Sequence, residues 1–306
     1  MPRFRFEISI CLSLIFLTSA VAARAATLSV NCGGKTGFAS IGAALKAAQF
    51  AGPTTINVSG ACHENVVIQS LDRLTLNAVN GASVTDASGG ALDVISIQDS
   101  RDVVIHGFTI NAGVGENANG VNCGDFSICR LSHNVIQGAT ASTGISVFGQ
   151  AQATLDGDTL QNNGIGLFIR SGGRVSTRVG AFTSRSNNQG INVGRQGFAY
   201  VTAVVENNSD AGVVVQWQSL FELLSGSISG NGGAGAIVKQ GSFARFPGST
   251  IGGNAGGGVV ISDLSMVDFT ASTVTGNGGT DVTCNPQYSA TRRVADTGGT
   301  TNCVEP

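Results

Sequence analysis

One group of ionisable residues in the middle of the chain has the types and order that acid–base catalysis needs. His106, Asp156 and Arg178 recur at equivalent places in successive sequence repeats, and Arg130 lies close to the same set. A base, a carboxylate and arginines are what removal of a proton alpha to a uronate carboxylate requires, because the arginines stabilise the negative charge that develops. We therefore predict a candidate catalytic set of His106, Arg130, Asp156 and Arg178.

Two other interpretations of these residues stay open. Asp156 and Asp158 are expected to face outward together, so they are candidates for the two carboxylates of a glycoside hydrolase. Alternatively, the group is a solvated polar stripe held by ion pairs, since the outer face of a sheet is normally polar. Whether the chain is an enzyme is left open. If it is one, we expect a polysaccharide lyase or a glycoside hydrolase; the alternative is a non-catalytic glycan-binding or adhesion protein, or a structural surface solenoid.

A second group of polar residues surrounds the single tryptophan of the chain. Its members occupy nearly corresponding positions in successive repeats and are interleaved with glutamines. Flat aromatic faces stack on sugar rings, whereas amides and cations bind hydroxyl and carboxylate groups. The alternative is that the tryptophan covers apolar side chains on the outside of its own sheet. The predicted polysaccharide-binding residues are Arg170, Arg195, Trp217, Lys239 and Asp263.

Both groups depend on a sequence repeat for their positions. An apolar residue stands before a polar turn at intervals of 22 to 26 residues, and most often of 23. A period in this range is typical of a solenoid, in which each repeat buries its apolar face against its neighbours. These anchor residues are Ile110, Ile136, Leu160, Phe182, Val205, Ile228, Ile251 and Val274.

An asparagine follows five of these anchors at the same distance. Stacked asparagines can form a ladder in one turn of a solenoid, each amide bonding to the next at about the 4.8 Å spacing of paired strands. We therefore interpret this column as structural. Its members are Asn163, Asn208, Asn231, Asn254 and Asn277.

Alternation of apolar and polar residues before each anchor predicts short β-strands. Leu155, Phe198, Tyr200 and Phe246 are expected to point inward, and Thr154 is expected to point outward. Two or three short strands in each repeat leave no room for a helix between them. The column that ends in Glu222, Arg245 and Asp268 is expected to be a ladder of cross-strand ion pairs.

Composition narrows the class of protein. Only 12% of the residues are charged and the net charge is −2, so neither a nucleic acid nor an anionic membrane is an expected partner. The chain contains 44 glycines and 5 prolines, and 42% of its residues are hydrophobic. This apolar content and the regular spacing argue against disorder and for a β-rich chain with many tight turns.

The repeats resemble those of the right-handed parallel β-helix superfamily, which has the pectate-lyase-like fold. The resemblance spans roughly residues 26–285. It implies an all-β, single-chain right-handed parallel β-helix of about 9–10 turns with a period of about 23 residues. It also implies a short capping helix at the N-terminal end, and "GFASIGAALKAA" places Phe38, Ile41, Ala44, Leu45 and Ala48 on one helical face.

The resemblance does not extend to one enzyme family. The acidic triad and Gly-His motif of polygalacturonases, the calcium-binding aspartates of pectate lyases and the arginine motif of pectin methylesterases are absent from this sequence. Calcium is implied only by the resemblance, and no other cofactor is indicated. No zinc site is predicted, since there is no CxxC motif and the three histidines are scattered.

The ends of the chain predict export. Arg3 and Arg5, an apolar run from Ile8 to Leu17 and an A-x-A site ending at Ala25 form a signal peptide, whose apolar run is too short to span a membrane. We expect a secreted or periplasmic protein without a membrane span in the mature chain; its oligomeric state is left open. The predicted segments are a signal peptide (1–25), an N-terminal cap (26–50), a parallel β-helix (51–285) and a C-terminal cap or tail (286–306).

Six cysteines remain after removal of the signal peptide. An even number in an oxidising compartment indicates three disulfides, although six cysteines allow 15 pairings. Proximity in the sequence favours Cys32–Cys62, Cys123–Cys129 and Cys284–Cys303.

Overall fold

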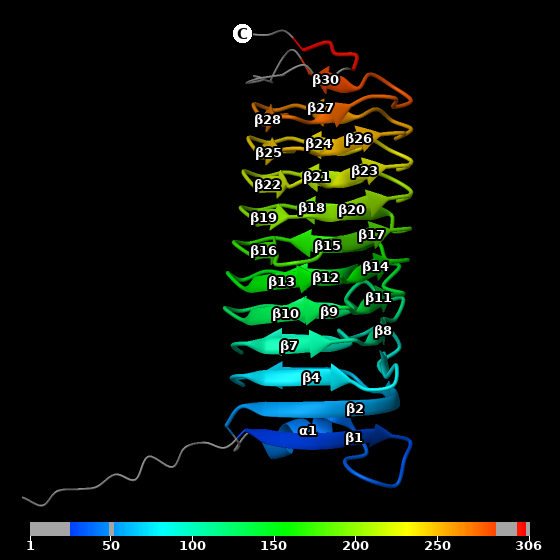
Figure 1. Cartoon of the computed structure of the whole chain (residues 1–306), viewed down its shortest axis with the longest axis vertical. Coiled ribbons are helices and arrows are strands. Elements are labelled where there is room, and N and C mark those ends of the chain that lie inside the picture. Colours follow the sequence, from blue (N-terminus) through cyan, green and yellow to red (C-terminus); the bar gives the residue numbers. More distant parts are fainter. Residues whose placement is uncertain (1–24, 49–51, 286–298, 304–306) are drawn as a thin grey trace, which may run out of the picture.

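The chain forms one long stack of short parallel strands (Figure 1). The structure is a computed structural model that describes residues 25–48, 52–285 and 299–303. The predicted signal peptide, except for its last residue, and most of the predicted C-terminal tail lie outside these residues. Each turn of the stack contributes strands to three faces, which we call sheets A, B and C, and every pairing between successive turns is parallel.

Sheet A carries the predicted catalytic residues. Along each strand, residues that point outward alternate with residues that point into the core, as the sequence pattern requires. Its strands are β1 (Ala26–Cys32), the first half of β2 (Thr54–His63), β4 (Leu74–Ala78), β7 (Val103–His106), β10 (Ile128–Ser132), β13 (Gln152–Asp156), β16 (Arg174–Thr177), β19 (Phe198–Val201), β22 (Leu220–Leu223), β25 (Phe243–Arg245) and β28 (Met266–Asp268).

Sheet B follows sheet A along the chain in each turn. The long strand β2 belongs to both sheets, because its first half pairs with β4 and its second half with β5. The remaining strands of sheet B are β5 (Ser83–Thr85), β8 (Thr109–Asn111), β11 (Val135–Gln137), β14 (Thr159–Gln161), β17 (Phe182–Arg185), β20 (Ala203–Glu206), β23 (Ser227–Ser229), β26 (Thr250–Gly252) and β29 (Thr273–Val274).

Sheet C closes each turn, and its ten strands confirm the predicted solenoid of about ten turns. The turns that lead from sheet C back to sheet A carry the tryptophan and its neighbours. Its strands are β3 (Val66–Gln69), β6 (Ile95–Gln98), β9 (Val121–Cys123), β12 (Thr143–Val147), β15 (Ile165–Ile169), β18 (Gln189–Val193), β21 (Val213–Val215), β24 (Ala236–Val238), β27 (Val259–Ile261) and β30 (Val282–Cys284).

The core is a set of like residues stacked along the axis. Phe221, Phe246 and Phe269 are buried on successive turns, with ring centroids 5.9 and 6.0 Å apart. Stacking of this kind removes apolar surface from water at every turn, which supplies most of the driving force for the fold.

The asparagine ladder is present and is longer than predicted. It runs from Asn163 to Asn277, and in it each side-chain N–H donates to the next amide oxygen at 2.8–3.1 Å. Asn187 is an additional member that the sequence pattern missed. At its end Asn277 donates to the Asp281 carboxylate at 2.8 Å, so the carboxylate terminates the ladder as an acceptor.

One turn of the solenoid has a different register from the predicted one. Ser184, rather than Phe182, pairs with Leu160 and Val205 in the anchor column. A single residue, Thr202, separates β19 from β20, so the alternation continues unbroken from one strand into the next. The prediction that Phe198 and Tyr200 point inward is therefore wrong.

The side chains that fill the core at this turn are smaller. Ala199 and Val201 enter the core, and both are fully buried. Phe198 and Tyr200 lie on the outer face of sheet A with 37% and 43% of their surface exposed.

The N-terminal end has the predicted helix. Helix α1 (Ile41–Ala48) buries Ile41, Ala44, Leu45 and Ala48, and Figure 1 shows it at the first turns of the stack. The Glu64 carboxylate accepts hydrogen bonds from the first two backbone N–H groups of α1 at 2.7 and 3.0 Å. Such an acceptor suits the partial positive charge at a helix N-terminus.

All three expected disulfides are formed in the structure. Cys32–Cys62 joins β1 to β2, Cys123–Cys129 joins β9 to β10, and Cys284–Cys303 lies at the last turn. Disulfides at these positions fit an oxidising compartment.

Candidate functional site

Three of the predicted catalytic residues, His106, Arg130 and Asp156, lie on the outer face of sheet A in two adjacent columns, and Arg178 directly follows strand β16 of this sheet. Ser132 pairs in register with His106 on one side and Asp156 on the other, and the His106 Nδ1 atom lies 2.8 Å from Ser132 Oγ. His106 and Asp156 are therefore two strand spacings apart, about 10 Å, with a serine between them. The structure brings these side chains onto one face but does not place the imidazole against the carboxylate.

The two arginines of the set lie beside this row. Arg130 and Arg178 line a hollow of about 320 Å³ together with Thr154, Ser176 and Thr177. The Arg130 guanidinium also forms an ion pair of 2.9 Å with Asp102, and both side chains are about half exposed. The hollow thus has two arginines in its lining, which suits a carboxylate-bearing ligand.

Asp158 does not face outward, contrary to the sequence prediction. Its side chain is only 1% exposed and lies in the turn between β13 and β14. Gly157, with a φ of 68°, bends the chain after β13, so the alternation of the strand stops there. The prediction that Asp156 and Asp158 form an outward pair of carboxylates is therefore wrong.

The buried Asp158 carboxyl is held by a set of donors. Its Oδ1 accepts hydrogen bonds from the backbone N–H of Asn134 at 2.9 Å and from the Asn134 side chain at 2.8 Å. Its Oδ2 accepts from the backbone N–H of Asp156 at 3.1 Å. Burial raises the pKa of Asp158 to about 6, although these hydrogen bonds act in the opposite direction.

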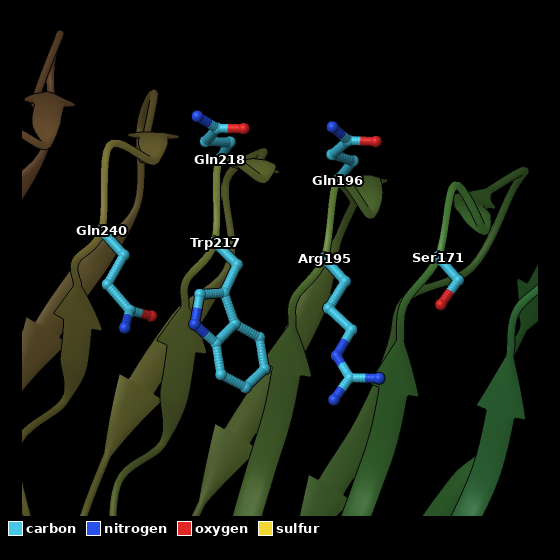
Figure 2. A pocket seen from close by; sticks show the side chains of 6 residues that line it. All are labelled: Ser171, Arg195, Gln196, Trp217, Gln218 and Gln240. Carbon is cyan, nitrogen blue, oxygen red and sulfur yellow. The ribbon is translucent and has the colours of Figure 1, made fainter.

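The tryptophan lies in an open groove of about 520 Å³ at the turns between sheets C and A, which we call the Trp217 groove (Figure 2). Arg195 and Trp217 occupy the same position on successive turns, two residues after the aligned Val193 and Val215. The next residue of each turn is a glutamine that extends from the turn beside its neighbour. The residues that line the groove are Ser171, Arg195, Gln196, Trp217, Gln218 and Gln240.

The geometry of the turns places these side chains in columns. Arg195 and Gln196 have φ values of 50° and 63°, and Trp217 and Gln218 have values of 54° and 58°. Because both turns contain the same pair of left-handed residues, equivalent side chains leave the backbone in the same direction. The groove is therefore a consequence of two equal turns on adjacent rungs.

Contacts with Arg195 and Gly194 fix the position of the indole ring. The Arg195 Cζ atom lies 5.3 Å from the centroid of the Trp217 ring, and a Cβ atom at Gly194 would lie 3.3 Å from Trp217 Cε3. Gly194 thus makes room for the ring, which keeps 41% of its surface exposed. An aromatic face, a cation and amides converge here on one open surface.

Only Arg195 and Trp217 of the five predicted binding residues line this groove. Lys239 and Arg170 come one residue earlier in their turns, directly after the aligned Val238 and Ile169. Asp263 is in the Trp217 column but two turns further along, beyond Gln240. Counting positions from the aligned strand residue separates the column of Arg170 and Lys239 from the column of Arg195 and Trp217, which comes one residue later in each turn.

Arg170 has a different environment from the one expected. Its Cζ atom lies 5.0 Å from the centroid of the Phe148 ring and 5.5 Å from that of Phe168. Its Nε atom is buried without a hydrogen-bond partner. Arg170 therefore belongs to the outer face of sheet C rather than to the Trp217 groove.

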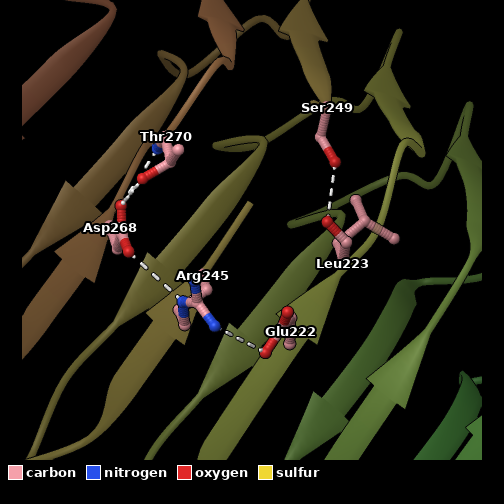
Figure 3. Close-up of polar contacts among 6 residues, drawn as sticks. All are labelled: Glu222, Leu223, Arg245, Ser249, Asp268 and Thr270. Atoms are coloured by element: carbon pink, nitrogen blue, oxygen red, sulfur yellow. Dashed lines mark hydrogen bonds and ion pairs between the residues drawn. The ribbon is translucent and has the colours of Figure 1, made fainter. Parts of the chain in front are cut away.

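A charged column on sheet A is structural, as predicted (Figure 3). Arg245 forms ion pairs of 3.2 Å with both Glu222 and Asp268 on the neighbouring strands. Burial alone would raise the pKa of Asp268, but hydrogen bonds from Thr270 and Arg245 outweigh it and lower that pKa. Each charge of this column has its partner in the adjacent turn.

One group of side chains has metal-ligand atoms close together within residues 25–48, 52–285 and 299–303. It consists of Cys32, Cys62 and Glu64. The two sulfurs are joined in a disulfide and Glu64 binds the N-terminus of α1, so the group does not fit a metal ion. Among the same described residues, no helix is both long enough and apolar enough to cross a membrane.

Comparisons with known proteins agree with this architecture. Residues 143–292 match the sequence model of the family described as "Right handed beta helix region". No protein of curated function matches the chain in sequence.

Two solved structures share the fold. One is the A-module of the mannuronan C-5 epimerase AlgE6 of Azotobacter vinelandii, with a TM-score of 0.50, 15% identity, and coverage of 85% of this chain and 92% of that one. The other is the pectate lyase Pel9A, with a TM-score of 0.50, 12% identity, and coverage of 87% of this chain and 76% of that one. At these identities the likeness concerns the fold alone. The chain is a right-handed parallel β-helix protein with a pectate-lyase-like fold, and no single enzyme family is indicated.

Proposed function

We propose that the chain is an exported β-helix protein that binds an acidic polysaccharide in the Trp217 groove. The observation that carries this proposal is the half-exposed indole beside the Arg195 guanidinium, with glutamines around both. An indole face stacks on the apolar face of a sugar ring, the guanidinium pairs with a carboxylate, and the amides bind hydroxyl groups. The names of the two similar structures, a mannuronan epimerase and a pectate lyase, favour the same class of ligand.

Affinity measurements on polygalacturonate, alginate and a neutral glucan test this proposal. We expect the purified protein to prefer the acidic polymers, and Trp217→Ala to weaken that binding at least about tenfold, because the stacking surface is lost. Leu264→Ala is the matched control, since Leu264 is an exposed apolar residue in an equivalent left-handed turn outside the groove. Unchanged binding by the Trp217 variant would show that the groove is not the site.

A second candidate function is cleavage of the same polymers at the sheet A hollow. The observation that favours it is the pair of arginines, Arg130 and Arg178, around a hollow next to Asp156. In a lyase, a base removes the proton alpha to the uronate carboxylate, the electron pair forms the new double bond, and the glycosidic oxygen leaves. The arginines would stabilise the carboxylate as negative charge spreads onto it.

Product analysis separates cleavage from binding. A lyase forms unsaturated uronate, read by its ultraviolet absorbance, whereas a hydrolase forms only new reducing ends. We expect Arg178→Ala to abolish any such activity and Arg174→Ala, at an exposed arginine at the start of the strand that precedes Arg178, to leave it unchanged. If neither product forms on acidic polymers, with or without calcium, the chain is not an enzyme of this kind.

A further inference from the structure

A second groove lies on the outer face of sheet C, at the opposite end of the strands from Trp217. We call it the Phe168 groove; it has a volume of about 420 Å³, and Glu116, Thr143, Ile165, Phe168, Asn188 and Gln189 are among its lining residues. Its side chains are an aromatic ring, an aliphatic residue, hydroxyls and amides, the same kinds that line sugar-binding surfaces. Glu116 is its charged lining residue.

A long connection between β8 and β9 forms one wall of this groove. Glu116 lies in that connection, which accounts for the 26-residue interval between the anchors of these two turns. Asn119 in the same connection accepts a hydrogen bond of 2.9 Å from Ser142, another residue of the groove. The wall is thus tied to the adjacent turn.

The two grooves are joined by a row of amides along β18. Gln189, which lines the Phe168 groove, accepts a hydrogen bond of 3.0 Å from the Asn192 side chain. Asn192 in turn accepts a hydrogen bond of 3.2 Å from Gln216, the residue before Trp217. These contacts fix which end of each amide faces its neighbour, so the surface between the grooves is ordered before a ligand arrives.

The paired strand β15 carries the apolar and cationic half of the same surface. Phe168 pairs in register with Asn192, and Arg170 stacks on Phe168 two residues further toward the Trp217 end. Gly194 directly follows β18 and has no side chain, so the Trp217 ring lies against it and adjoins the end of this surface.

We infer that the Trp217 and Phe168 grooves are the two ends of one binding surface, which crosses β15 and β18 along the strand direction. This inference rests on the proposed function and extends it. From Gln189 to Val193, the length of β18, the surface measures about 13 Å at about 3.3 Å per residue, and the turn that carries Arg195 extends it, which requires a chain of several sugars. Arg195 selects an acidic sugar at the Trp217 end, whereas Glu116 repels one at the Phe168 end. The ligand is therefore a mixed polymer of acidic and uncharged sugars.

The test compares oligosaccharides of two lengths by calorimetry. The probes are a disaccharide and a hexasaccharide in which galacturonate alternates with rhamnose, together with hexagalacturonate. We expect the alternating hexasaccharide to bind about tenfold more tightly than the disaccharide or more, because it reaches both grooves. Hexagalacturonate is expected to bind more weakly than the alternating hexasaccharide, and Glu116→Gln should reduce that difference.

Variants in the Phe168 groove test whether its residues cause the tighter binding of the hexasaccharide. Phe168→Ala and Gln189→Ala should each remove most of the gain for the hexasaccharide and leave binding of the disaccharide within about twofold. Val260→Ala, on the outer face of the same sheet in strand β27, is the control and should change neither. An unchanged melting temperature shows that each variant is folded.

The outcomes separate this inference from the function on which it rests. Equal affinity for both alternating oligosaccharides, or a hexasaccharide affinity that is unaffected in both far-groove variants, overturns the extended surface and leaves binding at Trp217 intact. Equal affinity for the two hexasaccharides overturns the assignment of an uncharged sugar to the Phe168 end. If the unaltered protein binds none of the probes, the proposed function and the extended surface are both wrong.

Discussion

Asp158 shows how a single glycine changes the chemistry of a neighbouring carboxyl. The strand pattern places Asp158 outside, next to Asp156, but Gly157 turns the chain and sends Asp158 into the space between two turns. There it binds Asn134 and helps to hold two rungs together. Alternation of apolar and polar residues does not indicate where a strand ends. Continued past the end of β13, this alternation therefore predicts the wrong face for Asp158.

The raised pKa of Asp158 predicts a loss of stability as the pH rises. The folded protein binds this proton more tightly than the unfolded chain does, since the pKa is about 6 in the fold and 3.8 in the reference state. The stabilisation is complete below about pH 4 and is lost as the pH passes through 6. The shift of about 2 units corresponds to up to about 3 kcal/mol.

Urea unfolding at pH 4 and pH 7 measures this effect. We expect the free energy of unfolding of the unaltered protein to contain a decrease over this range that is absent from Asp158→Asn. Asp86 does not contribute to the difference, because its pKa is lowered to about 2 and the group is the same in both proteins. Identical pH profiles for the two proteins would contradict a protonated, buried Asp158.

At the scale of a structural element, the asparagine ladder shows what a repeat pattern can and cannot predict. Asn163 and four of its stacked partners were identified from their constant distance to an apolar anchor. Asn187 was missed because its anchor is Ser184, a polar residue that enters the core and donates to the Gly190 carbonyl at 2.8 Å. A search for apolar anchors does not detect Ser184, because its buried hydroxyl group is polar and is satisfied by a hydrogen bond.

Two adjacent asparagines provide a matched test of the ladder. Asn187 accepts from the backbone and side chain of Asn163 and donates to Asn208, whereas Asn188 is exposed at the surface. Asn187→Ala should lower the free energy of unfolding by roughly 3 kcal/mol, because buried donors are left without acceptors. Asn188→Ala should change it by less than about 0.5 kcal/mol. Thermal and urea unfolding of both variants measure the difference. Equal effects of the two substitutions would show that the asparagine ladder does not stabilise the fold.

At the scale of the whole molecule, the fold was predictable and the site only in part. Every turn repeats the same requirement for inward apolar residues, so one wrong turn, at Phe198 and Tyr200, leaves the overall pattern intact. The binding groove has no such redundancy, because an offset of one residue separates the column of Arg170 and Lys239 from that of Arg195 and Trp217. Side-chain contacts between turns, which no periodicity records, decide which column lines the groove.

The inward and outward faces make a prediction for the complete solenoid. Leu155 is fully buried on the inner face of sheet A, and its neighbour Thr154 lies on the outer face. Leu155→Asp places an unpaired carboxylate in the core and should cost several kcal/mol, about 4 or more, enough to unfold the chain at room temperature.

Circular dichroism of the two variants checks this register. Thr154→Asp is the control and should retain the β-sheet spectrum and a melting temperature within a few degrees of the unaltered protein. If both variants folded equally well, the assignment of Leu155 to the inner face and Thr154 to the outer face would be wrong.

Because the solenoid is a stack of turns, turns can be added to it without changing the residues of the proposed binding surface. The proposed binding surface draws residues from six rungs, from Glu116 before β9 to Gln240 after β24, and each rung pairs only with the one before and the one after it. A tandem copy of the segment from β9 to β24, with its flanking connections, would therefore create a second surface displaced by about 29 Å along the axis, six strand spacings. The number of binding surfaces on the molecule would then be set by copy number, while helix α1 at the first turns remains unchanged.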